Sequence, residues 1–345
     1  MEEDLKVAVK GVEEKRAHEM GNNVALAIKH LGASGNGLDL RRMHRIIVTS
    51  DLGGEIANLS IERGFEKSIT HTNEEYAVAL AQVNILPIGD DYEIVIIIDA
   101  HLAAALTHTE LMNPYDLDVH DACHILHHEL CHVHDNNKKI DALSKVMLNH
   151  VYTGKDKLTM PLTEVCWSEY IANYLSASSV SEGHLIGKND SLLDSIYRAK
   201  QIVNEEILYY RYDGDLLKLI EMFERHGAFL PKTASLMLGY LDGLEITLNE
   251  LDNDVSKSLS DSYFEPTWTA MRKALREMRE KYPDGWEDIS IYNELAIAID
   301  NYCSDMGLVL SNTAEGELYV DVPFRPETTP SNPLIPVGID WFKEK

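Results

Sequence analysis

Residues 124–135 read HILHHELCHVHD, and the candidate site is deduced from this stretch. His128 and His132 are four residues apart and Glu129 follows the first, which is the pattern HExxH. Positions four apart on an α-helix lie one turn above each other, so both imidazoles can reach one metal ion. Glu129 would lie beside that ion, where its carboxylate can take a proton from a bound water. The stretch therefore predicts a helix that carries a zinc site and a catalytic base.

The flanking residues predict that this helix is amphipathic. Its apolar face consists of four residues at helical spacing: Ala122, Leu126, Leu130 and Val133. His128 and His132 each lie two residues, or about 200°, from members of that face. We expect the helix to begin after a cap at Asp116 or Asp118 and to run to about Asn136. The two imidazoles should then point away from the core.

The stretch holds more histidines than one ion can use. His120 and His124 continue the four-residue spacing of the pair. His124 lies about 12 Å along the helix from His132, so these two cannot share one tetrahedral ion. We expect His124 to line the pocket or to hydrogen-bond a ligand. His127 and His134 fall off the ligand face and should be either exposed to solvent or hydrogen-bonded within the structure.

A catalytic zinc needs a third protein ligand and an open position for water. In the motif HExxHxxGxxH the glycine and the third histidine would stand where this chain has Asp135 and Lys138, so that class is excluded. A carboxylate from a following helix is the other solution. Residues 163–177, TEVCWSEYIANYLSA, offer Glu164 and Glu169 for this role.

Helical phase favours Glu169 as the third ligand. We expect this helix to be capped by Thr163, with a core face of Trp167, Ile171, Tyr174 and Leu175. Glu169 lies about 200° from Ile171, on the face that also holds Ala172, Asn173 and Ser176. Glu164 lies near the core face in the first turn, where a carboxylate simply favours the helix dipole. Asn173 would suit hydrogen bonding to a ligand. The alternative for Glu169 is a solvated helix carboxylate.

Together the two helices resemble the gluzincins, which are metallopeptidases with HExxH and a downstream Glu ligand. The second helix is similar to the ImmA/IrrE-type pattern ExxAxxxxA, whose positions are held here by Glu169, Ala172 and Ala177. The resemblance covers these two helices. It implies a zincin-like α+β fold, with a mixed sheet, an active-site helix beneath it and a mostly helical second lobe. It also implies Zn²⁺ as the cofactor, bound by His128, His132 and Glu169.

A chain of this type would hydrolyse peptide bonds by metal-activated water, with Glu129 as the general base. An edge strand, for which the hairpin at residues 77–99 is the candidate, would pair with the peptide substrate. The donor to the developing oxyanion stays open among Tyr170, Tyr174, His226 and Tyr240. The alternative function is a metal-binding regulatory or interaction protein on the same scaffold with little or no turnover. A third interpretation is an ordinary helix without a metal. The intact Glu129 favours the enzyme.

The remaining segments predict mixed secondary structure. Residues 1–34 read as a helix with an apolar stripe of Val24, Leu26, Ala27 and Leu31, ended by the glycine-rich residues 32–37. Residues 46–49, 77–86 and 93–99 read as strands, the last two forming a hairpin around a turn at 87–91. After the site helix we expect a helix at 140–150, a loop at 151–161, a helix to Ala177 and a polar break at 178–190. The chain then reads as mostly helical to about Met306, with a small hairpin at 308–310 and 318–322 and an extended tail at 323–336.

Composition bounds the class of protein and its partners. With 345 residues, 45% of them hydrophobic and 26% charged, the chain can form a zincin-like catalytic domain at 1–180 and a mostly helical lobe at 181–345. The 57 acidic and 31 basic residues give a net charge of −26, which disfavours nucleic acid and membrane partners and would tolerate or attract a basic substrate. The expected partner, a peptide or protein substrate, follows from the peptidase hypothesis and not from the charge. The oligomeric state stays open. The charged N-terminus and the four cysteines without a disulfide pattern predict a cytoplasmic protein with reduced thiols. We expect Cys131 to be a small buried hydrophobe.

Overall fold

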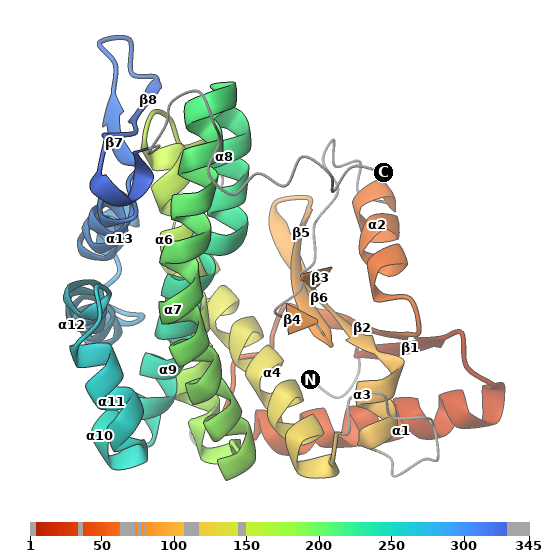
Figure 1. Cartoon of the computed structure of the whole chain (residues 1–345). Helices are drawn as coiled ribbons and strands as arrows, with labels where there is room; N and C mark the ends of the chain where they lie inside the picture. The colour runs from red at the N-terminus through yellow and green to blue at the C-terminus, as the bar shows by residue number, and fades with distance from the viewer. Residues whose placement is uncertain are drawn as a thin grey trace, which may run out of the picture. The chain divides into compact units, whose positions relative to one another are not determined.

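The computed structural model describes residues 5–33, 37–62, 73–74, 77–78, 80–106, 117–143 and 150–329. The chain is of mixed α+β class, as expected (Figure 1). It divides into two compact units. Unit 1 consists of Met1–Ala142 and Ile171–Leu185, and unit 2 of Leu143–Tyr170 and Ile186–Lys345. The boundary that we expect at residue 180 stays a prediction.

A mixed four-stranded sheet lies in unit 1, in the order β1-β2-β6-β5. Its strands are β1 (Lys6–Lys10), β2 (Met43–Thr49), β5 (Ala81–Ile88) and β6 (Asp91–Asp99). β2 runs parallel to both β1 and β6, whereas β5 pairs antiparallel with β6. The predicted hairpin is therefore confirmed, and its turn is only Gly89 and Asp90. Gly89 has φ +56°, a conformation that glycine adopts without steric cost. A separate short pair joins β3 (Asn73–Glu74) and β4 (Ala77–Val78).

Both faces of this sheet are covered by helices (Figure 1). Ile94–Ile98 of β6 have no exposed surface, and their side chains alternate between the two faces. One face packs against α1 (Glu14–Gly32), α3 (Ala100–Ala105) and α4 (Val119–Ala142), and the other against α2 (Leu52–Glu62). Each fully buried isoleucine side chain stabilises the fold by about 1.5–3 kcal/mol. This burial on both sides explains why β6 is a continuous apolar run.

The start of the chain differs from the prediction of one helix over residues 1–34. β1 precedes α1, which begins only at Glu14, and residues 1–4 and 34–36 lie outside the described part. The buried face of α1 is Met20, Val24, Ile28 and Gly32, spaced by four. Leu26 of the predicted stripe is 53% exposed, so that assignment is wrong, while Val24 is buried as expected.

Helix α4 carries the HExxH motif and is longer than predicted. It begins after Asp118, whose Oδ1 accepts a hydrogen bond from the Asp121 amide at 2.8 Å. The alternative cap, Asp116, lies outside the described residues. The helix continues past Asn136 to Ala142, so the first residues of the helix predicted at 140–150 belong to α4, and 144–149 are not described.

Helix α6 (Asp156–Ser176) also begins earlier than predicted. The loop predicted at 151–161 is wrong from Asp156 onward, because Pro161 lies inside the helix. Thr163 is not its cap, since the Thr163 hydroxyl is buried and donates to the Thr159 carbonyl at 2.8 Å. A 3₁₀ turn, η1 (Ala177–Ser179), follows the helix.

Most of unit 2 is helical, as expected. Its further helices are α7 (Glu182–Asp213), α8 (Leu216–Met222), η2 (Phe223–Gly227), α9 (Phe229–Gly243), α10 (Leu248–Leu251), α11 (Asn253–Ser260), α12 (Glu265–Lys281), η3 (Ile289–Tyr292) and α13 (Asn293–Asp305). The polar break predicted at 178–190 is too long, because α7 begins at Glu182 and its first residues lie in unit 1. An aromatic cluster fills part of the core of unit 2, with Trp167 and Trp286 ring centroids 4.9 Å apart.

The C-terminal hairpin is confirmed as β7 (Val309–Asn312) paired antiparallel with β8 (Leu318–Asp321). Of the tail predicted at 323–336, the structure describes the residues up to 329, which include a 3₁₀ turn, η4 (Pro326–Thr328). None of the helices in the described ranges is both long and apolar enough to cross a membrane.

Candidate metal centre

The two histidines of the motif face each other on α4. Nε2 of His128 and Nε2 of His132 are 2.9 Å apart, and the ring centroids are 4.5 Å apart with an interplanar angle of 86°. Both side chains are partly exposed. The spacing of four residues therefore brings one nitrogen of each ring toward a common point, as the helical geometry predicts.

Glu169 joins this pair. One ligand atom from each of His128, His132 and Glu169 lies within 4.8 Å of the others. Glu169 belongs to α6, a continuous helix that passes from unit 2 to unit 1 between Tyr170 and Ile171. Glu169 therefore lies two residues before Ile171, where the chain enters unit 1, the unit that also contains α4. The three residues brought together are those that the sequence predicts as metal ligands.

A shared hydroxyl fastens the end of α6 to α4 within unit 1. Ser179 Oγ lies 2.9 Å from Nδ1 of His124 and 2.8 Å from Nδ1 of His127. Its single proton is donated to the Ser176 carbonyl at 2.9 Å. Because the hydroxyl has no second proton, it accepts from both imidazoles, which must each carry a hydrogen on Nδ1. Burial lowers the pKa of His127, which favours the neutral form of that ring.

The other histidines of α4 lie outside the three-residue cluster. His124 is only 1% exposed and is held by Ser179, and its expected support of a ligand stays a prediction. His127 is 3% exposed, and Nδ1 of His134 accepts a hydrogen bond from the Asp39 amide at 2.8 Å. Of the two alternatives for His127 and His134, hydrogen bonding within the structure is therefore the one observed.

Within unit 2, Glu169 lies among residues that hold α6 against α9. Nζ of Lys232 is 3.5 Å from Glu169 Oε1, and the Glu169 side chain is only 16% exposed. The Tyr170 hydroxyl donates to Asp242 Oδ2 at 2.7 Å. One turn earlier, burial raises the pKa of the Cys166 thiol to about 12, which keeps that thiol protonated. A side chain so enclosed does not fit the alternative of a solvated helix carboxylate.

The predicted division of this helix into a core face and a ligand face is wrong. Tyr174 and Leu175 are only partly buried, whereas three residues assigned to the opposite face are buried: Ala172, Asn173 and Ser176. Two tertiary contacts involve the second half of the helix: the Ser179 hydroxyl of η1 donates to the Ser176 carbonyl within unit 1, and the Tyr170 hydroxyl donates to Asp242 of α9 within unit 2. Asn173 is 1% exposed and stands one turn after Glu169 on the same side of the helix.

Glu129 and Cys131 lie on α4 between the two histidines. Glu129 is 9% exposed and is not one of the three clustered residues, and its role as a base stays a prediction. Burial, and then the nearby Glu129 carboxylate, raise the pKa of the Cys131 thiol well above its usual value. Cys131 is fully buried and is not one of the three clustered residues, which fits the small hydrophobe that we expect.

The donor set fits zinc. Two imidazole nitrogens and one carboxylate are the ligands of many catalytic zinc sites, which leave a fourth position open. Nitrogens bound to one tetrahedral zinc at about 2.1 Å each are about 3.4 Å apart. The observed 2.9 Å separation of the two Nε2 atoms is about 0.5 Å shorter, a difference that small side-chain rotations remove. Both rings are partly exposed and so have room to rotate.

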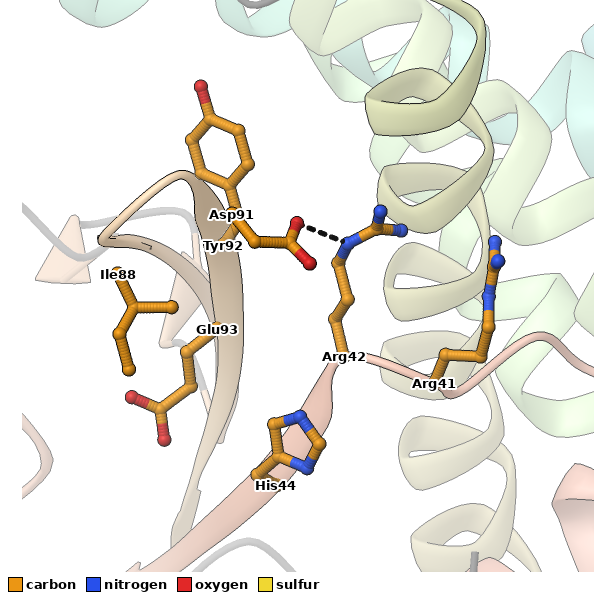
Figure 2. A pocket seen from close by; sticks show the side chains of 7 residues that line it. All are labelled: Arg41, Arg42, His44, Ile88, Asp91, Tyr92 and Glu93. Carbon is orange, nitrogen blue, oxygen red and sulfur yellow. Dashed lines mark hydrogen bonds and ion pairs between the residues drawn. The ribbon is translucent and has the colours of Figure 1, made fainter.

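Two cavities lie elsewhere, and neither includes a residue of the cluster. The first, of about 470 Å³, lies in unit 1 beside the β5–β6 turn (Figure 2). Its arginines are already paired with carboxylates: Arg41 with Asp39 and Asp141, and Arg42 with Asp91 and Asp141. The second, of about 390 Å³, lies in unit 2 between α12, η3 and the first turn of α13.

The four candidates for the oxyanion donor differ in how buried they are and in whether their proton is already donated within the structure. Tyr170 already donates its hydroxyl proton to Asp242, and Tyr240 is 1% exposed. Tyr174 and His226 are partly exposed.

Sequence reasoning missed Ser179 and Lys232. Lys232 has a signal in retrospect, because it is the only charged residue in the otherwise apolar and polar run from Phe229 to Leu241.

No family model, curated protein or solved structure gives a significant match to this chain.

Proposed function

We propose that this chain is a zinc-dependent peptidase built on a zincin-like scaffold. The observation that carries the proposal is the convergence of His128, His132 and Glu169, which come from two helices and bring ligand atoms within 4.8 Å of one another. Two helices must be placed correctly to produce such a cluster, and the Ser179 hydroxyl holds their ends together in unit 1. A buried carboxylate at Glu129, between the two histidines, supplies the group that hydrolysis needs.

A zinc ion held by these three residues would act as a Lewis acid and lower the pKa of a water molecule. Glu129 would take the proton of the attacking water on its carboxylate and pass it to the leaving nitrogen of the peptide. His128 and His132 would offer the Nε2 atoms that already converge.

The scaffold supports a peptide substrate through the sheet. β5 is an edge strand, so one row of its backbone hydrogen-bonding groups has no neighbour within this sheet. An extended peptide can pair with such an edge. α4 packs on one face of the same sheet, which is the arrangement of an active-site helix beneath a mixed sheet.

The test is the substitution Glu129→Gln, with Glu164→Gln as the matched control. Glu164 lies on the same helix as Glu169, and its Oε1 accepts from the Tyr152 hydroxyl, a contact that glutamine can keep. We expect Glu129→Gln to keep zinc and to lose about 10²–10⁴-fold in peptide hydrolysis. Glu164→Gln should hydrolyse like the wild type. Equal hydrolysis by the wild type and Glu129→Gln would refute the mechanism, and zinc binding without turnover in the wild type would favour the regulatory alternative.

A further inference from the structure

The two edge strands of the sheet in unit 1 differ in charge. β1 reads KVAVK, with a lysine at each end, whereas β5 reads AQVNILPI and holds no charged residue, in a chain of which 26% is charged. Charged side chains on an edge strand, lysine above all, discourage pairing with another chain, because the added strand would have to desolvate them. β1 has this protection and β5 lacks it. β5 is therefore the edge that is suited to accept a further strand.

The register of β5 fixes which of its backbone groups face outward. Ile88 and Asp91 are paired across a two-residue turn, and the Leu80 carbonyl accepts from the Asp99 amide at 2.8 Å. Both observations place the even-numbered residues of β5 in the hydrogen-bonded pairs with β6, because such pairs alternate along an antiparallel ladder. The N–H and C=O groups of the odd-numbered residues then point away from β6. Within the described ranges, no backbone hydrogen bond joins these groups to another element.

Pro87 agrees with this register and limits the free edge. It is one of the odd-numbered residues, and a proline, which has no N–H, fits a position whose N–H the ladder does not use. An added strand can therefore both donate to and accept from Ala81, Val83 and Ile85, but at Pro87 it can only donate to the carbonyl. Full pairing with β5 is confined to Ala81–Ile85.

The side chains of the same outward-facing residues lie on the face of the sheet that carries α4. Ala81 belongs to the buried cluster that includes α4, Val83 packs against that cluster, and Ile85 is directly opposite Ile94, another of its members. Directly opposed residues of an antiparallel pair share a face. Ala81 is 8% exposed, whereas Ile85 is 39% exposed. A peptide residue level with Ile85 would therefore cover an apolar side chain that is still partly open to solvent.

We propose that the peptide substrate pairs with β5 along Ala81–Ile85, and that Val83 and Ile85 select apolar residues at two substrate positions, i and i+2. The proposal rests on the proposed peptidase function, which makes the bound strand a substrate. Successive residues of an extended peptide point to opposite faces, so only every second one lies beside Val83 and Ile85. The substrate class is an extended segment with apolar residues at alternate positions.

The first test measures peptide binding to the zinc-loaded Glu129→Gln variant. Two fluorescein-labelled polyserine peptides of equal length, with amidated C-termini, each carry two valines, at i and i+2 in one and at i and i+3 in the other. Fluorescence anisotropy should show that the i, i+2 peptide binds about 3- to 10-fold more tightly, because only one valine of the other peptide can lie on the face of Val83 and Ile85. Equal affinity would overturn the inference.

N-methylation of the i, i+2 peptide tests the backbone pairing itself. A methyl group on an amide nitrogen removes one donor and keeps the neighbouring strand at a distance. When the methyl group is moved along the peptide one residue at a time, binding should weaken about tenfold or more at every second position and little at the positions between them. The same effect at every position, or no effect at any, would overturn the strand pairing.

Variants of β5 assign the selection to its side chains. Ile85→Thr keeps the β-branched shape and removes apolar surface, so it should abolish most of the preference for the i, i+2 peptide without changing zinc affinity. Ile88→Thr is the matched control, because Ile88 is 49% exposed on the same strand but lies on the opposite face, with its backbone groups directed to β6. It should keep the preference. An equal effect of the two substitutions would overturn the role of Ile85.

Failure of this inference is distinguishable from failure of the peptidase. A wild type that hydrolyses the i, i+2 and the i, i+3 peptides equally well would overturn the inference and keep the peptidase. A zinc-loaded wild type that binds the i, i+2 peptide with the alternating N-methyl pattern, but hydrolyses no peptide, would overturn the peptidase and keep the pairing position on β5.

Discussion

Replacing Asp242 by asparagine should destabilise unit 2 by about 2–4 kcal/mol. The Asp242 side chain is 1% exposed and accepts hydrogen bonds from Tyr170 at 2.7 Å and from Arg276 at 2.5–3.1 Å, with Arg279 at 3.4 Å. Impairing the buried Tyr170 hydrogen bond costs about 1–3 kcal/mol. Arg276 is 41% exposed and can turn to water, so losing its charged partner adds only about 1 kcal/mol.

The pH dependence gives a second measurement of the same interaction. Burial alone would raise the pKa of Asp242, but the hydrogen bonds and charges of Arg276 and Tyr170 outweigh it, and the pKa lies below the usual 3.8. A carboxyl group whose pKa is lower in the folded state contributes stability above its unfolded pKa and loses it as the pH falls through the folded pKa. The difference between wild type and Asp242→Asn should therefore be full near neutral pH and shrink below about pH 4.

Urea unfolding followed by tryptophan fluorescence is the assay, because Trp167, Trp268 and Trp286 are all buried in unit 2. Asp300→Asn is the matched control. Asp300 pairs with Lys155 at 2.7 Å in the same unit, but both side chains are about a third exposed, so its loss should cost less than about 1 kcal/mol. A cost for Asp242→Asn no larger than that of Asp300→Asn, or one that does not vary with pH, would refute the reasoning.

Three further substitutions test the contacts that place the site. Ser179→Ala removes the acceptor shared by His124 and His127 and should destabilise unit 1 by about 1–3 kcal/mol in urea unfolding; no change would mean that the hydroxyl does not hold η1 on α4. Gly154→Ala should lower the free energy of unfolding more than Gly89→Ala in the same assay. Both glycines have positive φ, but a Cβ at Gly154 would clash with Asn312 and the Gly316 carbonyl, whereas Gly89 faces open space. Equal costs would contradict this packing. Asp118→Ala should cost about 1 kcal/mol as a true helix cap and Thr163→Val less, and the reverse order would restore the cap predicted at Thr163.

The elements that sequence reasoning placed correctly are those with strong local patterns. β6 contains the unbroken β-branched run Ile94–Ile98, and α4 combines helical periodicity with a cap at Asp118. β1 has only three apolar residues between two lysines. It becomes a strand because it pairs in parallel with β2, from which it is separated by all of α1, and no local pattern reports such a contact.

The second ligand helix shows where a local rule misleads. Pro161 reads as the end of a loop, because proline removes one hydrogen bond from a helix interior. Here it is the sixth residue of α6, close enough to the N-terminus that few backbone bonds are affected, and its side chain is exposed. Tertiary contacts then decide the buried faces of α6. Periodicity assumed one buried face, whereas the consecutive residues Tyr170, Ile171, Ala172 and Asn173 are all buried.

In the site, too, local spacing can be predicted from the sequence and tertiary contacts cannot. His128, Glu129 and His132 are set by spacing within one helix, so they can be predicted from the sequence. Glu169 could be selected because helix 163–177 offers only two carboxylates. Ser179 could not be predicted, because it acts through histidines distant in the sequence. Lys232 stands out as a lone charge in its helix, but its pairing with Glu169 could not be predicted either.

The most direct test of the metal centre is zinc affinity, measured by competition with a chromogenic chelator on protein purified without a histidine tag. The wild type should bind about one zinc per chain, and Glu169→Gln should bind it about 100-fold or more weakly, while Glu164→Gln keeps the wild-type affinity. Zinc affinity in Glu169→Gln equal to that of the wild type, or substoichiometric zinc in the wild type at saturation, would contradict a centre formed by His128, His132 and Glu169.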